Sequence, residues 1–171
     1  SSKEELLATP QADGRSLQDH ITDLMGKIGE KIDVVSYETV NADQVVAYTH
    51  STGKLGVLVG LVNTNGTDVT EVGKDIAMQI AAMKPIALDK DGVDAATIER
   101  EIEIGKEQAR QEGKPEQMLE KIAQGKLNKF YKENTLLSQQ FVKDNSKSIA
   151  QYLDGVSKGL TVNAFKRISI G

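Results

Sequence analysis

Cysteine is absent from the 171 residues of this sequence, which excludes disulfide bonds and any zinc site built from thiolates. Long hydrophobic runs are also missing, since no apolar run approaches the roughly 18 residues that a membrane-spanning helix requires. No signal peptide is recognisable near the start of the chain. We therefore expect a cytoplasmic protein that does not bind a membrane. Because the sequence begins with Ser1 and not with methionine, we also expect a fragment of a longer protein.

A surplus of positive charge is missing as well. The 21 Lys and Arg residues are outnumbered by 25 Asp and Glu residues, which gives a net charge of −4. Proteins that bind the phosphate backbone of nucleic acids usually carry a basic surface, so we expect no direct nucleic-acid partner. The chain length fits one domain, or one domain with an appended module.

Signatures of nucleotide-binding or catalytic sites are likewise scarce. Six Gly-Lys dipeptides occur, but none has the glycine five positions earlier that a phosphate-binding loop requires. His20 and His50 lie far apart, and neither has a second His or Glu at a spacing that suits a metal. We interpret both histidines as surface or half-buried residues rather than as ligands or bases. The sequence predicts no catalytic residue, no metal site and no cofactor.

The acidic clusters have structural interpretations. Asp89, Asp91 and Asp94 would suit the start of a calcium-binding loop, but the twelfth position holds Arg100 where a glutamate is required. We therefore interpret Asp94 as the cap of a helix. The glutamates between residues 99 and 107 favour a solvated helix face with ion-pair partners four residues away.

A charged stretch from residue 94 to residue 133 is interrupted at Lys114-Pro115 and predicts two antiparallel helices. Gly113 can end the first helix with positive φ, and Pro115 suits the first position of the second helix. Because a glycine inside a helix costs about 1 kcal/mol, we infer that Gly105 and Gly125 admit large side chains from the opposite helix. The predicted pairs are Ala109 with Met118, Gly105 with Ile122, Ile102 with Gly125, and Ile98 with Lys129 or, more favourably, Phe130.

The rest of the chain alternates between helical and strand patterns. Ser16 is expected to cap a helix that ends at Gly29. Residues 32–40, 45–50 and 54–62 are rich in Val, Ile, Tyr and Thr, and predict a three-stranded antiparallel meander. A second helix is expected at 72–83. After the helical hairpin we expect a short strand or extended segment at 136–142, a helix at 146–153 and a final strand at 161–170.

Together these elements predict an α+β fold, with a small antiparallel sheet and packed helices in two subdomains and a protruding antiparallel helical hairpin. The first core subdomain, with helix, meander and helix, is expected at residues 16–92. The hairpin is expected at 93–133 and the second core subdomain at 134–171. The hairpin should protrude because nearly all positions outside its helix interface are charged or polar.

Four segments resemble bacterial elongation factor Ts and occur in that family's order. They are residues 53–59 (GKLGVLV), 75–85 (DIAMQIAAMKP), 113–115 (GKP) and 139–148 (QQFVKDNSKS). The resemblance extends over nearly the whole chain from about Leu24 onward. It implies a guanine nucleotide exchange factor for elongation factor Tu, with a core of two subdomains that carries a coiled-coil hairpin.

The resemblance also implies which residues contact the partner. Leu55 and Gly56 match positions at which the family touches elongation factor Tu, although an ordinary hairpin entry explains them equally well. Val142 and Lys143 match a contact segment of the second subdomain, where Val142 could equally be a core residue. Gln79 stands at a partner-contact position where the family often has histidine, and this departure weakens the case for an invariant polar role.

Two features of the family have no counterpart in this sequence. They are an amino-terminal helical module that docks on the GTPase domain and a Thr-Asp-Phe-Val segment that helps to displace magnesium. We therefore expect this chain to bind elongation factor Tu through its core and to accelerate nucleotide release weakly at most. The alternative hypothesis is a structural or oligomerisation scaffold without exchange activity, in which sheet edges or the hairpin join subunits. A homodimer is possible in either case.

Overall fold

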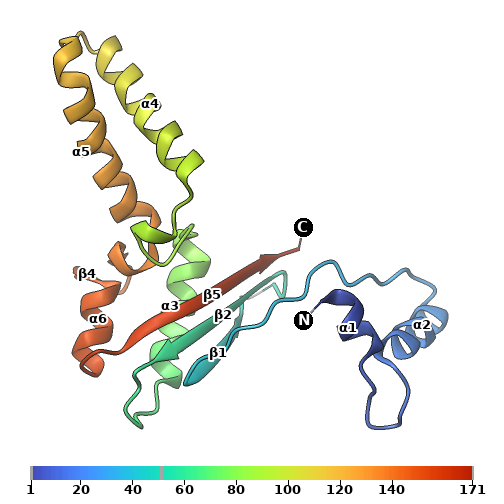
Figure 1. Ribbon diagram of the computed structural model, residues 1–171. Coiled ribbons are helices and arrows are strands. Elements are labelled where there is room, and N and C mark those ends of the chain that lie inside the picture. The colour runs from blue at the N-terminus through green and yellow to red at the C-terminus, as the bar shows by residue number, and fades with distance from the viewer. Residues whose placement is uncertain (1, 51, 171) are drawn as a thin grey trace. The chain divides into compact units, whose positions relative to one another are not determined.

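The computed structural model describes residues 2–50 and 52–170, and Figure 1 shows its helices and strands. The chain divides into two compact units, Ser1–Thr39 and Val40–Gly171. Helices and small antiparallel sheets make up the fold, which confirms the expected α+β class. The expected division into a first core subdomain at 16–92, a hairpin at 93–133 and a second core subdomain at 134–171 stays a prediction.

The first unit holds two helices, α1 (Lys3–Ala8) and α2 (Leu17–Ile28). Ser16 caps α2 as expected, because its hydroxyl accepts a hydrogen bond from the Asp19 N–H while the Asp19 carboxylate accepts one from the Ser16 N–H. Gly29 ends α2 in the left-handed conformation, with φ at 72°. No described residue of this unit is buried.

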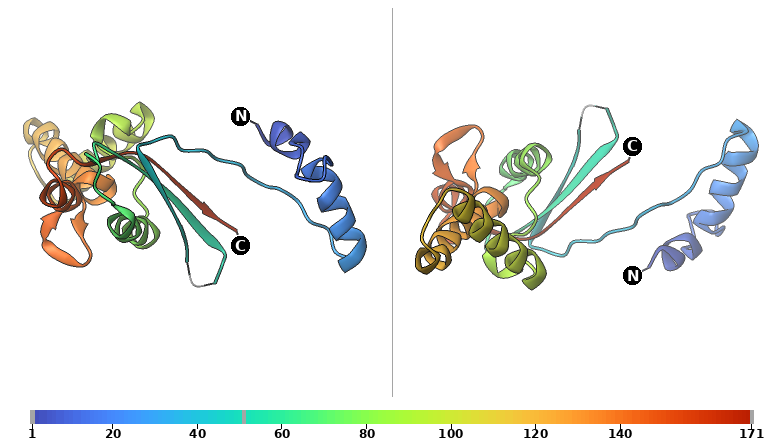
Figure 2. Two further views of the ribbon diagram at one scale, coloured as in Figure 1. Left: turned by 90° about the horizontal axis from the view of Figure 1, so that it is seen from below. Right: turned by 90° about the horizontal axis from the view of Figure 1, so that it is seen from above.

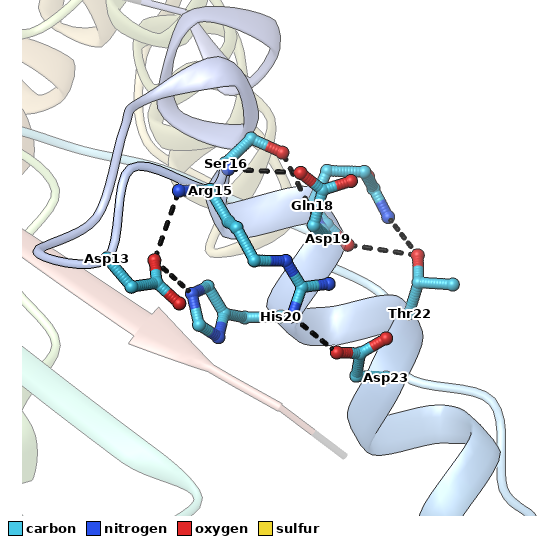
Figure 3. Close-up of polar contacts among 8 residues, drawn as sticks. All are labelled: Asp13, Arg15, Ser16, Gln18, Asp19, His20, Thr22 and Asp23. Atoms are coloured by element: carbon cyan, nitrogen blue, oxygen red, sulfur yellow. Dashed lines mark hydrogen bonds and ion pairs between the residues drawn. The ribbon is translucent and has the colours of Figure 1, made fainter.

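Polar contacts organise the start of α2, as Figure 3 shows. The Asp13 carboxylate accepts a hydrogen bond from the Arg15 N–H at 3.0 Å and lies 3.1 Å from Nε2 of His20. The backbone hydrogen bond, followed by the contact with His20, lowers the pKa of Asp13. The Arg15 guanidinium pairs with Asp23 at 2.7 Å. His20 therefore has the surface role that the sequence predicts.

Residues 31–41 form no strand, so the predicted strand at 32–40 is wrong. The residues of this segment have high β-propensity, but such propensity mainly reflects packing on a pleated, half-buried surface. Val35 is 70% exposed and has no such surface to pack on. The predicted meander is consequently wrong as well, because the third strand of the sheet comes from elsewhere in the chain.

The sheet of the second unit has the order β1-β2-β5, with antiparallel neighbours. Its strands are β1 (Gln44–Thr49), β2 (Leu55–Val62) and β5 (Thr161–Ser169). Central Val59 pairs with Val46 on one side and Phe165 on the other. The strands predicted at 45–50, 54–62 and 161–170 are thus confirmed, but the final strand joins the first two. Figure 2 shows β5 beside β2 in both views.

Helix α3 (Thr70–Met83) packs against one face of this sheet. On β2 the alternate residues Val57, Val59 and Leu61 are buried on this face, as the period of two in a strand requires. Gly73 allows the close approach, since a Cβ at this position would lie 2.3 Å from a methyl group of Val46. The core continues beyond α3, β1 and β2 into Leu136, Phe141, Ile149, Leu153, Leu160 and Val162.

Helices α4 (Ala95–Gln111) and α5 (Glu116–Asn134) lie side by side and antiparallel, as Figure 1 shows. Asp94 caps α4 by accepting a hydrogen bond from the Thr97 N–H at 2.8 Å. Gly113 has a φ of 75°, as expected for the end of the first helix. Pro115 is the N-cap of α5 and not its first residue, so the helix begins at Glu116, one residue later than predicted. Below, we call these two helices the α4–α5 pair.

The α4–α5 pair is tightly packed at Gly105. A Cβ on Gly105 would lie 3.1 Å from the Cα of Ala123, so the glycine favours a close approach of the backbones and does not admit the predicted large side chain. The residue that Gly105 meets is Ala123 and not Ile122, so the predicted partner is wrong. The nearby ion pair between Lys106 Nζ and Glu120, at 2.7 Å, joins the two helices on their exposed side.

The buried face of α5 differs from the predicted one, which contained Met118, Ile122 and Gly125. Met118 is 46% exposed, whereas its predicted partner Ala109 is fully buried. A Cβ on Gly125 would meet nothing within 4 Å, so this glycine admits no side chain from α4. Both faces of α5 repeat apolar or small residues at helical spacing, which is why the pattern selected the wrong one. The residues of α5 that are buried are Leu119, Ala123 and Leu127.

Short elements complete the second unit. The segment at 136–142, expected as a short strand or extended segment, is a 3-10 turn, η2 (Leu136–Ser138), followed by the two-residue strand β3 (Gln140–Phe141). Strand β4 (Asp144–Ser148) pairs with β3. Helix α6 (Ile149–Val156) begins later than the predicted 146–153, because Ser148 is its cap and accepts a hydrogen bond from the Gln151 N–H. A further 3-10 turn, η1 (Lys90–Gly92), precedes α4.

Candidate protein-binding site

A two-residue turn, Val142–Lys143, connects β3 to β4 and presents two of the predicted contact residues. Its ends are fixed by the antiparallel pair between Phe141 and Asp144. The Val142 side chain is 50% exposed and that of Lys143 53% exposed, whereas Phe141 is buried. Val142 is therefore not a core residue in this structure. The period of two in a strand explains the difference, because the chain buries Phe141 and turns outward immediately after it.

Gln79 reaches this turn from beneath, although it has no exposed surface of its own. Its side-chain NH₂ donates hydrogen bonds to the backbone oxygen of Gln140 at 3.0 Å and to Oε1 of Gln139 at 3.2 Å. Its Oε1 accepts a hydrogen bond from the Val142 N–H at 2.9 Å. The structure therefore brings Gln79, Val142 and Lys143 into one region. Gln79 does not itself lie at the surface.

Gln139 is the second buried amide of this region, with 1% of its surface exposed. Besides accepting from Gln79, it donates to the backbone oxygen of Glu133 at 3.0 Å. Glu133 lies in the last turn of α5, whose carbonyl groups lack partners within the helix. Gln139 thus satisfies the end of α5 and the Gln79 amide at the same time.

Asp75, four residues before Gln79 on α3, contacts Lys143 of the Val142–Lys143 turn. One oxygen of its carboxylate pairs with Nζ of Lys143, and the other accepts a hydrogen bond from the Tyr152 hydroxyl at 2.9 Å. The Tyr152 ring stacks on Phe141, with ring centroids 4.3 Å apart. Burial, together with the hydrogen bond to Asp75, raises the pKa of Tyr152 to about 12.

Leu55 and Gly56 begin β2 and lie at a different place in the second unit. Leu55 pairs with Ser169 at the end of β5, whereas α6, whose Tyr152 stacks on Phe141 beside the turn, precedes the start of β5. Strand β5 has nine extended residues, so its two ends lie roughly 25 Å apart. A Cβ on Gly56 would meet nothing within 4 Å, so its surface is open to a close approach. These two residues therefore form a second patch, which the structure does not join to the turn.

The remaining polar candidates have structural partners. His50 Nδ1 lies 3.0 Å from the Tyr48 hydroxyl, and the Asp89 carboxylate accepts a hydrogen bond from the Asp91 N–H. Within residues 2–50 and 52–170, no group of three or more His, Asp or Glu side chains is arranged to hold a metal ion. Over the same residues, no helix is both long and apolar enough to cross a membrane.

Sequence reasoning did not identify Asp75, Gln139 or Tyr152 as supports of the turn. Their signal was weak, because each is a single polar residue in a helix or loop and their contacts with α3 or with the turn join residues 60 or more positions apart. For Gln79 a signal existed. It follows Ile76 by three positions, which places it next to Ile76 on the helix surface, and Ile76 is fully buried.

Comparison with known proteins identifies the family of this chain. The family model described as Elongation factor TS matches residues 1–171. Elongation factor Ts of Cytophaga hutchinsonii is 68% identical over 170 residues, which is 99% of this chain and 61% of the relative. The proteins of the same name from Amoebophilus asiaticus and Thermobifida fusca are 56% and 44% identical, over 94% and 97% of this chain. The chain belongs to the elongation factor Ts family.

The chain spans about 60% of the length of the curated relatives that it matches. The match reaches the first residue of the chain and thus includes the segment before Leu24, where the four resembling segments gave no information.

Proposed function

We propose that this chain is the core of a translation elongation factor that binds elongation factor Tu and promotes release of its guanine nucleotide in the cytoplasm. The observation that carries the proposal is the supported turn at Val142–Lys143, in a chain that belongs to the elongation factor Ts family. An exposed valine and an exposed lysine held by a buried framework suit protein recognition, which depends on preorganised apolar and charged groups. The patch at Leu55 and Gly56 is proposed as a second contact.

The proposed activity is a shift of binding equilibria and breaks no covalent bond. An exchange factor binds the nucleotide-free GTPase more tightly than the nucleotide-bound form. By linkage, it weakens nucleotide binding by the same ratio. The role of this chain is to supply differential affinity through its surface, so neither a catalytic residue nor a cofactor is proposed.

Binding is tested by gel filtration and titration calorimetry with nucleotide-free elongation factor Tu. Lys143→Ala is compared with Lys147→Ala, a matched control in β4 whose side chain is 54% exposed. We expect Lys143→Ala to weaken binding by about tenfold and Lys147→Ala to leave it unchanged. Equal affinities of the two variants would show that the turn is not a contact.

Exchange is measured separately, by stopped-flow release of a fluorescent GDP analogue from elongation factor Tu. We expect this chain to accelerate release weakly at most, and a longer version with the amino-terminal module and the Thr-Asp-Phe-Val segment to accelerate it strongly. Comparable acceleration by both versions would show that the core alone opens the nucleotide site.

The second patch has its own test. Gly56→Asp should weaken binding, because it places a charge and a side chain where the partner backbone is proposed to approach. Gly56→Ala adds only a methyl group into open space, so its effect should be smaller. Circular dichroism shows whether both variants are folded. Unchanged affinity of a folded Gly56→Asp chain would place the interface elsewhere.

A scaffold function is the second candidate, and the edges of the sheet favour it. In the order β1-β2-β5, strands β1 and β5 each pair on one side only within the described residues. A free edge can pair with another chain, which would give a homodimer. Analytical ultracentrifugation over a range of concentrations tests this candidate. A monomer at all concentrations that still binds elongation factor Tu would exclude it.

A further inference from the structure

Two properties of the Gln79 side chain distinguish it from a residue that contacts a partner at the surface. It is completely buried, and its three hydrogen bonds go to one short stretch of chain, Gln139 to Val142. Both N–H donors of the amide are used, and its oxygen accepts from the Val142 backbone. Gln79 therefore satisfies backbone groups on the two residues that flank Phe141.

The hairpin formed by β3 and β4 cannot order this turn by itself. Strand β3 has two residues, and the register shifts between its two pairs, Gln140 with Ser148 and Phe141 with Asp144. Even longer isolated two-stranded hairpins are only marginally stable in water. The conformation of the turn must therefore depend on contacts from other elements.

Contacts from α3 and α6 supply that order in two ways. Phe141 is buried and stacked on Tyr152, which fixes the position of one strand but not the direction of the backbone after it. The hydrogen bond from the Val142 N–H to Gln79 fixes that direction, because the N–H must point into the core toward α3. The Val142 side chain is then left at the surface.

We propose that Gln79 is a positioning residue that holds the Val142–Lys143 turn in the conformation that the protein partner binds, without touching the partner. This inference rests on the function proposed above. It changes the role that the resemblance implies for Gln79 from a contact to a support. Removal of Gln79 should therefore affect the partner only through the turn.

The requirement is for an amide and not merely for a side chain of this volume. A leucine at this position would fill much of the space, but the Val142 N–H and the Gln140 backbone oxygen would lose their partner. A buried unpaired backbone group is costly, so the turn would rearrange to reach water. A histidine would keep at most one donor and one acceptor in its neutral form, so it should have an intermediate effect.

The test compares Gln79→Leu and Gln79→His with Ile76→Val in the full 171-residue chain. Ile76 is also fully buried on α3, so Ile76→Val controls for a general loss of stability. Amide hydrogen exchange at Val142, measured by NMR, reports the order of the turn. Titration calorimetry with nucleotide-free elongation factor Tu reports affinity. Each variant is also combined with Lys143→Ala in a double-mutant cycle.

In Gln79→Leu we expect exchange at Val142 to accelerate by about tenfold or more, and binding to weaken by about tenfold, relative to Ile76→Val. The exchange rate and the affinity of Gln79→His should lie between those of Gln79→Leu and those of the unsubstituted chain. Gln79→His serves as the main variant if Gln79→Leu does not fold. In the Lys143→Ala background the loss caused by the Gln79 variant should be smaller, because one of the two side chains that the ordered turn presents to the partner is already missing.

Three results would overturn the inference. The first is slow exchange at Val142 in a folded Gln79 variant. The second is an affinity no weaker than that of Ile76→Val, and the third is a loss that adds in full to that of Lys143→Ala. Failure of the proposed function has a different signature, since the unsubstituted chain would then not bind elongation factor Tu, and that result would overturn both proposals.

Discussion

The contact between α3 and the sheet differs from the contact between α4 and α5 in the size of the side chains that fill it. Beneath α3, the buried residues are mostly branched and apolar, such as Leu61, Ile76 and Ile80. Between α4 and α5, small residues bring the backbones together, and Gly105 meets the Cα of Ala123. Apart from the close approach at Gly73, the first contact is filled by large side chains, whereas the second is set by how closely two helices can approach.

This difference predicts opposite sensitivities to substitution. A contact filled by large side chains loses stability when atoms are removed, because a cavity remains. A contact set by close backbone approach loses stability when atoms are added, because the helices must separate. The predictions below test this contrast and the polar contacts around it.

Leu61→Ala should have the largest effect. Leu61 is completely buried in β2 beneath α3, so its truncation should lower the free energy of unfolding by about 2–5 kcal/mol. Urea denaturation followed by circular dichroism measures this loss. Ile104→Ala on the α4–α5 pair is the control, because Ile104 is 42% exposed and its loss should be small. Equal losses in the two variants would contradict the contrast.

Gly105→Leu should come next, with a loss of about 1–3 kcal/mol from overpacking against Ala123. Gly125→Leu is its matched control on the same helix pair, because an added Cβ at Gly125 meets nothing within 4 Å. Gly125→Leu should be neutral or slightly stabilising, since leucine favours helix more than glycine does. Urea denaturation of the two variants measures the difference in their free energies of unfolding. If Gly125→Leu is the less stable of the two, the helix face assigned here is wrong.

Tyr152→Phe removes the hydroxyl that donates to Asp75 and should cost about 1 kcal/mol at neutral pH. Its clearer effect is on pH dependence. The pKa of Tyr152 is raised from 10.0 to about 12, so the folded state keeps a proton that the unfolded state loses. The stabilisation that protonated Tyr152 contributes should therefore be fully present below about pH 10 and be lost between about pH 10 and 12. Urea midpoints from pH 8 to 11 should show a shallower decline in Tyr152→Phe; an unchanged slope would contradict the assignment.

Glu120→Gln should have the smallest effect. It removes one of the two negative partners of Lys106, in an ion pair whose glutamate side chain is 71% exposed. Such surface pairs contribute little, and salt screens them. We expect a slight decrease in the thermal midpoint at low ionic strength that disappears in about 1 M salt. A decrease that persists in high salt would indicate a packing role for Glu120.

Local signals in the sequence predicted the elements well where short-range chemistry decides them. Ser16 and Asp94 accept hydrogen bonds from N–H groups three residues away, and Gly29 and Gly113 adopt the positive φ that ends a helix. These features involve residues close in sequence, so their types alone indicate them. The fold class and the α4–α5 helices followed from the same kind of information.

Partners distant in the chain could not be inferred in the same way. Strand β2 pairs with β5, which lies about 100 residues later, and nothing in either segment specifies that partner. The face of α5 was also ambiguous, because Met118 and Leu119 both begin a series with helical spacing. At the candidate site, Val142 and Lys143 were found through the family resemblance. The buried support from Gln79 became visible only in the hydrogen bonds of the folded chain.

The pairing of β2 with β5 also bears on the order in which the chain can fold during synthesis. Until residues 161–169 have left the ribosome, β2 has only β1 beside it, and a two-stranded hairpin is marginal by itself. The α4–α5 helices depend on contacts within about 40 residues and can form earlier. A nascent chain stalled before β5 therefore exposes an unpaired edge of β2, where wrong pairing with another chain can begin.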